Sequence, residues 1–184
     1  MYCHTLNSCA DLYAYFHFEL GNKSYFPDGA QKISDDRLFG MFHSCTPQHK
    51  DVILKSLTQS DGLVRVVFAT VALGMGVNIK EVNLVVHYGA PHSIDDYFQE
   101  SGRSGRSGDN ARSVVFWKPS GCPVKKEPKC LHDREVIDVR KYLENTTVCR
   151  RKWLLDFFDP GCATPGDDKL LCCDICANSI NIDT

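Results

Sequence analysis

Two arginines, Arg103 and Arg106, stand among small residues in the stretch FQESGRSGRSG at positions 98–108. Arginine presents a planar fork of N–H donors that matches the oxygens of a phosphate group. Glycine and serine neighbours leave room for a bulky anion to approach the backbone. The stretch therefore predicts a turn that contacts phosphate, and its plain alternative is a solvated surface turn.

Cysteines form a second candidate site near the end of the chain, where Cys173 and Cys176 make a C-x-x-C pair. Two thiolates at this spacing reach one ion from a tight turn, and two further thiolates complete a tetrahedron. The spacing predicts a structural zinc ion with the ligands Cys149, Cys162, Cys173 and Cys176, and Cys172 could exchange with Cys173. Four thiolates leave no open position for water or substrate, so we expect no metal chemistry. The alternative is a set of buried free thiols or a redox pair.

Strands that alternate with helices must position these residues. Hydrophobic patterns predict strands at 38–44, 63–70, 83–89 and 111–117, and helices at 6–20, 47–57 and 91–100. Residues 63–70 are β-branched and apolar, which is typical of a strand covered on both faces of a parallel sheet. Ser93 and Asp96 form a plausible capping pair for the third helix. The order predicts a parallel α/β sheet, in which ligands bind beyond the carboxyl ends of the strands.

The later part of the chain has a different character. Residues 118–130 hold three prolines and four lysines and indicate a linker. Helical patterns follow at 131–145 and 147–158, so we expect one domain at 1–118 and a linker with a small subdomain at 119–184. An apolar strand at the first residues suggests that the natural protein continues upstream. We expect the aromatic pair Tyr97 and Phe98 to pack in the core.

Composition is that of an ordinary soluble globular protein, with 43% hydrophobic and 24% charged residues. The net charge of −2 gives no general attraction to nucleic acid, so any such binding needs a local basic patch. No run approaches the length of a membrane span, and the first residues lack a signal-peptide pattern. We therefore expect no membrane partner and an intracellular location, where thiols stay reduced.

Three segments resemble RecQ-type DNA helicases. The segment VVFATVALGMGVNIKEVNLVVHYGAPHSIDDYFQESGRSGRSG resembles the fifth and sixth motifs of that family, which lie in the second of its two RecA-like domains. MYCHTLNSCADL resembles the end of the fourth motif, and CRRKWLLDFF…CCDIC resembles the zinc-binding subdomain that follows the helicase core. The resemblance spans nearly the whole chain. It implies a RecA-like parallel sheet with flanking helices, followed by a small helical zinc-binding subdomain.

The resemblance also implies roles for individual residues. Arg106 matches the arginine finger, which reaches across a cleft to the γ-phosphate of the nucleotide. Arg103 matches a companion arginine that contacts phosphate or holds the interdomain geometry. The other matched positions are Gln99, which opens the sixth motif; Gly74, Gly76 and Asn78 in the fifth motif, which couples nucleotide state to DNA; and Thr70, at a strand end where the family touches the DNA backbone.

DNA is the partner that the resemblance implies, as a single strand or a tailed duplex, with 3′→5′ translocation driven by ATP and Mg²⁺. In a eukaryote it further implies a nuclear location. Near the cysteines, a run of cations could grip the DNA backbone, with an affinity that falls as salt rises. Its members are Arg140, Lys141, Arg150, Arg151 and Lys152. A solvated helix surface is the equally weighted alternative for this run.

One expected part of a helicase does not occur in this sequence. There is no G-x-x-x-x-G-K-[ST] loop to hold the phosphates of a nucleotide, and no acidic Mg²⁺-binding box follows an apolar strand. We therefore expect the chain to need an upstream RecA-like domain, in cis or in trans, and to hydrolyse no ATP by itself. Two alternatives stay open: a non-catalytic module that binds DNA or a partner, and a zinc-stabilised adaptor with no nucleic-acid role.

Overall fold

A computed structural model of the chain describes residues 1–27, 36–43, 47–59, 61–70, 79, 82–106, 108, 110–122, 130–161 and 168–180. The chain divides into two compact units. The first unit contains Met1–Pro91 and Gln99–Gly121, and the second contains His92–Phe98 and Cys122–Thr184. Gly74, Gly76, Asn78 and Cys162, and most of the predicted linker, lie outside the described residues.

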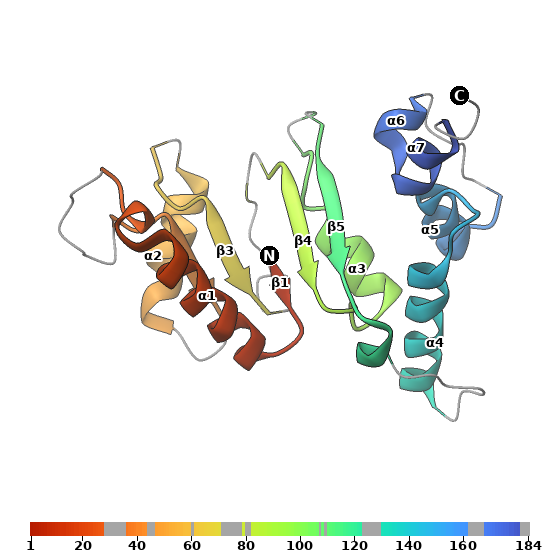
Figure 1. Ribbon diagram of the computed structural model, residues 1–184, viewed down its shortest axis with the longest axis horizontal. Helices are drawn as coiled ribbons and strands as arrows, with labels where there is room; N and C mark the ends of the chain where they lie inside the picture. Colours follow the sequence, from red (N-terminus) through yellow and green to blue (C-terminus); the bar gives the residue numbers. More distant parts are fainter. Residues whose placement is uncertain are drawn as a thin grey trace. The chain divides into compact units, whose positions relative to one another are not determined.

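The first unit is built on a five-stranded sheet with the order β2-β3-β1-β4-β5. Its strands are β1 (Tyr2–Cys3), β2 (Phe39–Phe42), β3 (Val66–Ala69), β4 (Leu84–Tyr88) and β5 (Arg112–Phe116). All four pairings between neighbouring strands are parallel, and β1 lies between β3 and β4 (Figure 1). The predicted parallel α/β sheet is therefore confirmed.

Helices α1 (Leu6–Leu20) and α2 (Pro47–Thr58) accompany this sheet, with short 3₁₀ turns at Gly21–Ser24 and Pro119–Gly121. Thr5 caps α1 by accepting a hydrogen bond from the Ser8 N–H at 3.1 Å. Gly21 ends the helix with a φ of 49°, in the left-handed region that glycine tolerates. Both helices lie within the boundaries that the hydrophobic pattern predicted, to within a residue.

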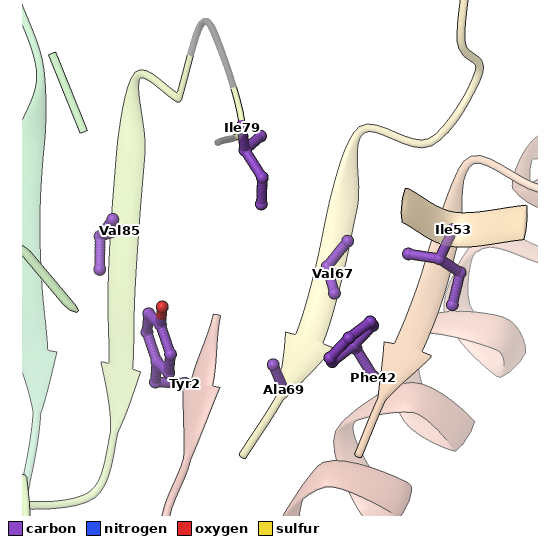
Figure 2. Close-up of a cluster of buried hydrophobic side chains, with 7 residues drawn as sticks. All are labelled: Tyr2, Phe42, Ile53, Val67, Ala69, Ile79 and Val85. Atoms are coloured by element: carbon purple, nitrogen blue, oxygen red, sulfur yellow. The ribbon is translucent and has the colours of Figure 1, made fainter. Parts of the chain in front are cut away.

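Among the described residues, two hydrophobic clusters lie in the core of the first unit. One joins Phe39 and Phe68 to aromatic residues of α1, and Phe68 has no exposed surface. The other contains Val67, Ala69 and Ile53 of α2, and Figure 2 shows it along the strands. Because successive side chains of a strand point to opposite faces, Phe68 and its neighbours Val67 and Ala69 serve opposite sides of the sheet. The sheet is thus covered on both faces, as its apolar strands predicted.

Helix α3 (Ile94–Ser101) leads into the arginine stretch. Its first turn is capped as predicted, because the Asp96 N–H donates to the Ser93 Oγ at 3.0 Å. Ile94 and Tyr97 are buried on this helix, with 1% and 5% exposure. Phe98 is instead 44% exposed, so only half of the aromatic pair packs in the core as predicted.

The second unit contains α4 (Leu131–Glu144), α5 (Arg150–Phe158), α6 (Lys169–Cys172) and α7 (Asp174–Ile180). Tyr142 of α4 is its central side chain. The Tyr142 ring lies 5.2 Å from the rings of both Tyr97 and Trp153, and its hydroxyl is 3.3 Å from that of Tyr97. Aromatic contacts of this kind supply the core of a unit that has few buried aliphatic residues.

Among the residues that the structure describes, no helix combines the length and the apolar character that crossing a membrane requires.

Candidate functional site

The arginine stretch forms a chain of tight turns directly after α3. The N–H of Arg103 donates to the Glu100 carbonyl at 3.3 Å, and the N–H of Ser104 donates to that of Ser101 at 3.1 Å. Gly105 then adopts a φ of 72°, which non-glycine residues rarely adopt. Gly105 therefore serves the backbone geometry as well as leaving space around the arginines.

Hydrogen bonds fasten the turn to the sheet of the first unit. The N–H of Gly105 donates to the carbonyl of Val82, two residues before β4, at 3.0 Å. The hydroxyls of Ser101 and Ser113 lie 3.0 Å apart, which joins the end of α3 to β5. The first contact ties the turn to the segment that leads into β4, and the second ties the end of α3 to β5, so both ends of this region are anchored to the first unit.

The two arginines differ in their surroundings. Arg106 is exposed, and its Nε donates to the Gly102 carbonyl at 3.3 Å, whereas Arg103 is half-buried. Burial raises the pKa of Tyr2 to about 12, while the positive charges of Arg103 and Arg106 act in the opposite direction. The inner end of the turn therefore faces the Tyr2 phenol of β1, and Arg106 is the arginine presented to solvent.

The structure describes only some of the other residues predicted to contact nucleotide or DNA. Gln99 is exposed on α3, in the same helix turn as Glu100 and Ser101. Thr70 follows the last residue of β3 and is half-buried. Since Gly74, Gly76 and Asn78 lie outside the described residues, the roles suggested for them stay predictions.

A buried histidine–glutamate pair next to the turn was not predicted from the sequence. His87 of β4 and Glu100 of α3 are 2% and 7% exposed, and the His87 Nε2 lies 2.9 Å from the Glu100 Oε2. The ring of Tyr2 stacks on that of His87, with centroids 5.4 Å apart. In the sequence, a histidine within the apolar strand VVHY indicates a buried polar side chain that needs a partner. The identity of that partner depends on the fold.

The second candidate site is a cluster of four half-buried thiols, from Cys149, Cys172, Cys173 and Cys176, whose sulfurs all lie within 4.8 Å of one another. The Sγ of Cys149 is 3.5 Å from that of Cys172 and 4.0 Å from that of Cys173. Tetrahedral zinc with Zn–S bonds of about 2.3 Å places its sulfurs about 3.8 Å apart. The four cysteines are therefore placed to hold a metal ion such as zinc.

The start of α5 favours the metal-binding form of one thiol. Burial raises the pKa of Cys149, but a backbone N–H of Lys152 and the thiol of Cys172 outweigh this effect, so the pKa falls to about 7. Cys149 is the N-cap residue of α5, where the helix presents unpaired N–H groups. Burial and the neighbouring thiols raise the pKa of Cys176, as expected for thiols that share one negative charge.

The structure brings together three of the four predicted zinc ligands, Cys149, Cys173 and Cys176. The fourth thiol of the cluster is that of Cys172, which the sequence suggested only as a substitute. Cys162 lies outside the described residues. The sequence analysis offered Cys172 only in place of its neighbour Cys173, because adjacent cysteines provide the same chemistry at nearly the same spacing.

The predicted basic face near the cysteines is largely neutralised within the second unit. Arg150 contacts both carboxylate oxygens of Asp174, at 2.6 and 2.9 Å, and its guanidinium lies 5.5 Å from the Tyr142 ring centroid. Three other cations of the run also have carboxylate partners, in the pairs Arg140–Glu144, Lys141–Asp138 and Lys152–Asp156. Arg151 is exposed. Arg150 thus has an internal role, which competes with its predicted contact to DNA.

Comparisons with known proteins agree with this architecture. Residues 23–108, which include the arginine turn, match the helicase conserved C-terminal domain. The chain is 37% identical over 127 residues to the "ATP-dependent helicase wrn-1" of Caenorhabditis elegans, which covers 64% of this chain and 12% of that protein. It is 34% identical over 122 residues to the "ATP-dependent DNA helicase RecQ" of Haemophilus influenzae, which covers 61% of this chain and 19% of that protein.

A third relative extends the similarity to the cysteine-rich end. The chain is 28% identical over 196 aligned positions to the "ATP-dependent helicase SGS1" of Saccharomyces cerevisiae, which covers 99% of this chain and 12% of that protein. The chain thus spans only about an eighth to a fifth of the length of the relatives described. The parallel sheet and the matched domain indicate a helicase C-terminal domain. More particularly, the similarities to these relatives support a C-terminal region of the RecQ helicase type.

Proposed function

We propose that this chain supplies the C-terminal half of an ATP-dependent 3′→5′ DNA helicase, with Arg106 as its arginine finger. One observation carries the proposal. Arg106 is exposed at the tip of a turn whose backbone is fixed to the sheet by the Gly105–Val82 hydrogen bond, and this turn lies inside the matched helicase domain. A fixed backbone with an exposed guanidinium suits a residue that must reach a group bound elsewhere.

Phosphoryl transfer needs chiefly positioning and charge stabilisation, and an arginine finger contributes about 10³–10⁵ in rate. In this proposal Arg106 neutralises negative charge that develops on the γ-phosphate, and the half-buried Arg103 orients the turn. ATP and Mg²⁺ are bound by a preceding RecA-like domain, supplied in cis or in trans. The zinc ion is structural, because four thiolates leave it no open coordination position.

DNA, as a single strand or a tailed duplex, is the proposed nucleic-acid partner. Thr70 and the fifth-motif residues Gly74, Gly76 and Asn78 would couple nucleotide state to the DNA backbone, and the exposed Arg151 would add a phosphate contact. For Arg150 the proposal is weaker, because Asp174 already occupies its guanidinium. In a eukaryotic cell this activity belongs in the nucleus.

The test is DNA-stimulated ATP hydrolysis by this chain joined to the nucleotide-binding domain of a full-length relative, here called the reconstituted helicase. We expect Arg106→Ala to lower kcat by about 10³-fold or more while nucleotide binding persists. Arg65→Ala is the matched control, because Arg65 is an exposed arginine of the same unit whose guanidinium donates to the Gly62 carbonyl. Equal kcat values for the two variants would refute the arginine-finger role.

The isolated chain provides a complementary measurement. Because its sequence contains no phosphate-binding loop, we expect negligible ATP hydrolysis from the chain alone, with or without DNA. A turnover that Arg106→Ala abolishes in the isolated chain would show that the nucleotide site had been wrongly assigned to another domain.

A further inference from the structure

His87 and Glu100 are two ionisable residues enclosed in the first unit, with 2% and 7% of their surfaces exposed. Their side chains meet at 2.9 Å, between the Nε2 of His87 and the Oε2 of Glu100. A buried polar side chain is costly unless it is hydrogen-bonded. The pair therefore ties the last turn of α3 to strand β4, next to the central strand β1, through a contact that would be expensive to break.

Glu100 is connected to the arginine turn through its backbone as well. Its carbonyl accepts the N–H of Arg103 at 3.3 Å, which is the first hydrogen bond after the helix. One residue thus holds the sheet by its side chain and starts the turn by its main chain. A shift of Glu100 would be passed directly to Arg103.

The imidazole is itself restrained from the opposite side. The ring of Tyr2 stacks on His87 at an interplanar angle of 17°, and Tyr2 is 7% exposed in β1. Because β1 and β4 are neighbouring strands with Tyr2 opposite His87 in the register, this contact is set by the sheet itself. Consecutive contacts therefore connect the centre of the sheet to the start of the turn, through Tyr2, His87 and Glu100.

We propose that His87 and Glu100 are a positioning pair that sets the orientation of Arg103 and Arg106 toward a phosphate. This inference rests on the proposed role of Arg106. Neither member of the pair is placed to touch the nucleotide; each acts through the turn. The physical reason is the steep dependence of catalysis on placement, since a displacement of about 1 Å far from the chemistry can cost about 10²-fold in rate.

The first experiment uses the isolated chain and needs no catalysis. We would record NMR signals of the backbone N–H groups of residues 102–106 and of the arginine Nε–H groups. Glu100→Ala should shift these signals and speed their exchange with solvent, whereas Glu100→Gln retains a hydrogen-bonding oxygen for His87 and should stay close to the original chain.

Two controls separate positioning from stability alone. Val67→Ala removes buried methyl groups from the sheet core without touching the turn, so it should lower stability yet leave the signals of residues 102–106 unchanged. Glu135→Gln alters a second His–carboxylate pair, His132–Glu135, which is exposed and 3.7 Å apart. The Glu135→Gln variant should change neither the stability of the chain nor the signals of residues 102–106. Unchanged turn signals in Glu100→Ala, or equal shifts in Val67→Ala, would overturn the proposal.

The second experiment measures ATP hydrolysis by the reconstituted helicase at a temperature where every variant is folded by circular dichroism. We expect Glu100→Ala to lower kcat by about 10- to 10²-fold with little change in KM for ATP, and Glu100→Gln to restore most of the loss. Val67→Ala should keep the original kcat. A change in KM for ATP with kcat unaffected would contradict a positioning role. So would a Glu100→Gln variant whose kcat is as low as that of Glu100→Ala.

A double variant connects the pair to the arginine. If His87 and Glu100 act through Arg106, adding Glu100→Ala to Arg106→Ala should cause no further loss of kcat. Multiplying losses would show that the pair acts by another route. Should Arg106→Ala alone leave kcat intact, the arginine-finger role fails, while the NMR measurement still decides whether the pair positions the turn.

Discussion

Arg150 donates from Nε and Nη2 to the two carboxylate oxygens of Asp174, at 2.6 and 2.9 Å. The first residue directly follows Cys149, and the second directly follows Cys173. A third hydrogen bond joins the Nη1 of Arg150 to the Tyr142 carbonyl at 2.9 Å. This bidentate pair connects the residues that follow two thiols of the cysteine cluster, so it helps to position those thiols relative to one another.

The first prediction concerns metal affinity. Asp174→Asn should weaken zinc binding by about 10- to 100-fold, because partners that orient metal ligands contribute effects of that size. Only one carboxylate oxygen is replaced and all four thiols remain. Competition with a chromophoric chelator would give the two dissociation constants.

Asp156→Asn is the matched control for this measurement. Asp156 also pairs with a cation of α5, Lys152, at 2.6 Å, but that pair lies within one helix and joins no two parts of the cluster. Zinc affinity should therefore be unaffected. Equal weakening in the two variants would mean that loss of charge, and not the Arg150–Asp174 contact, governs binding.

The second prediction concerns acid stability. Burial raises the pKa of Asp174, but the hydrogen bond and charge of Arg150 outweigh it and leave the pKa below its ordinary value. A folded-state pKa below the unfolded one stabilises the chain above the unfolded pKa, and this stabilisation is lost as pH falls through the folded pKa. Since the Asp174 side chain is 56% exposed, we expect no more than about 1 kcal/mol.

Thermal unfolding of the metal-free chain between neutral pH and pH 3 would measure this contribution. Asp174→Asn should unfold at a lower temperature near neutral pH and converge with the original chain at the acid end. A constant difference across the whole range would show that the carboxylate contributes through packing and not through its charge.

The third prediction concerns the identity of the fourth metal ligand. The described geometry places the Cys172 sulfur 3.5 Å from that of Cys149, so Cys172→Ser should bind less zinc than the original chain. Cys176→Ser should likewise lose zinc. Full zinc content in Cys172→Ser together with loss in Cys162→Ser would instead support the ligand set that the sequence suggested. Zinc per chain after dialysis against a weak chelator distinguishes these outcomes.

The sequence predicted features that depend on local pattern. The strand at 63–70 and the Ser93 cap followed from side-chain type and spacing alone, and the structure confirms both. The His87–Glu100 pair escaped prediction because its members lie 13 residues apart on different elements. Contacts of this kind depend on the register of α3 against β4, which hydrophobic periodicity does not determine.

The function of a run of charged residues also depends on contacts that the sequence does not show. The cations near residue 150 were equally compatible with a DNA surface and a solvated helix, because sequence alone does not show where their counter-charges lie. The structure supplies Asp174 as the partner of Arg150, 24 residues further along the chain. Within α4 and α5, by contrast, the i,i+4 pairs Arg140–Glu144 and Lys152–Asp156 could have been read from spacing.

The fourth prediction concerns Gly105, whose φ of 72° and hydrogen bond to Val82 hold the arginine turn. Alanine at this position should cost about 1–2 kcal/mol, because a Cβ disfavours the left-handed region. Relief of that strain would move the turn, so Gly105→Ala should also lower kcat of the reconstituted helicase.

Gly121→Ala is the control, because its Cβ would meet no atom within 4 Å and no left-handed φ is required there. Chemical denaturation should find Gly121→Ala within about 0.5 kcal/mol of the original chain. Equal stability and equal kcat for the two alanine variants would show that the left-handed turn places no demand on the position of Arg106.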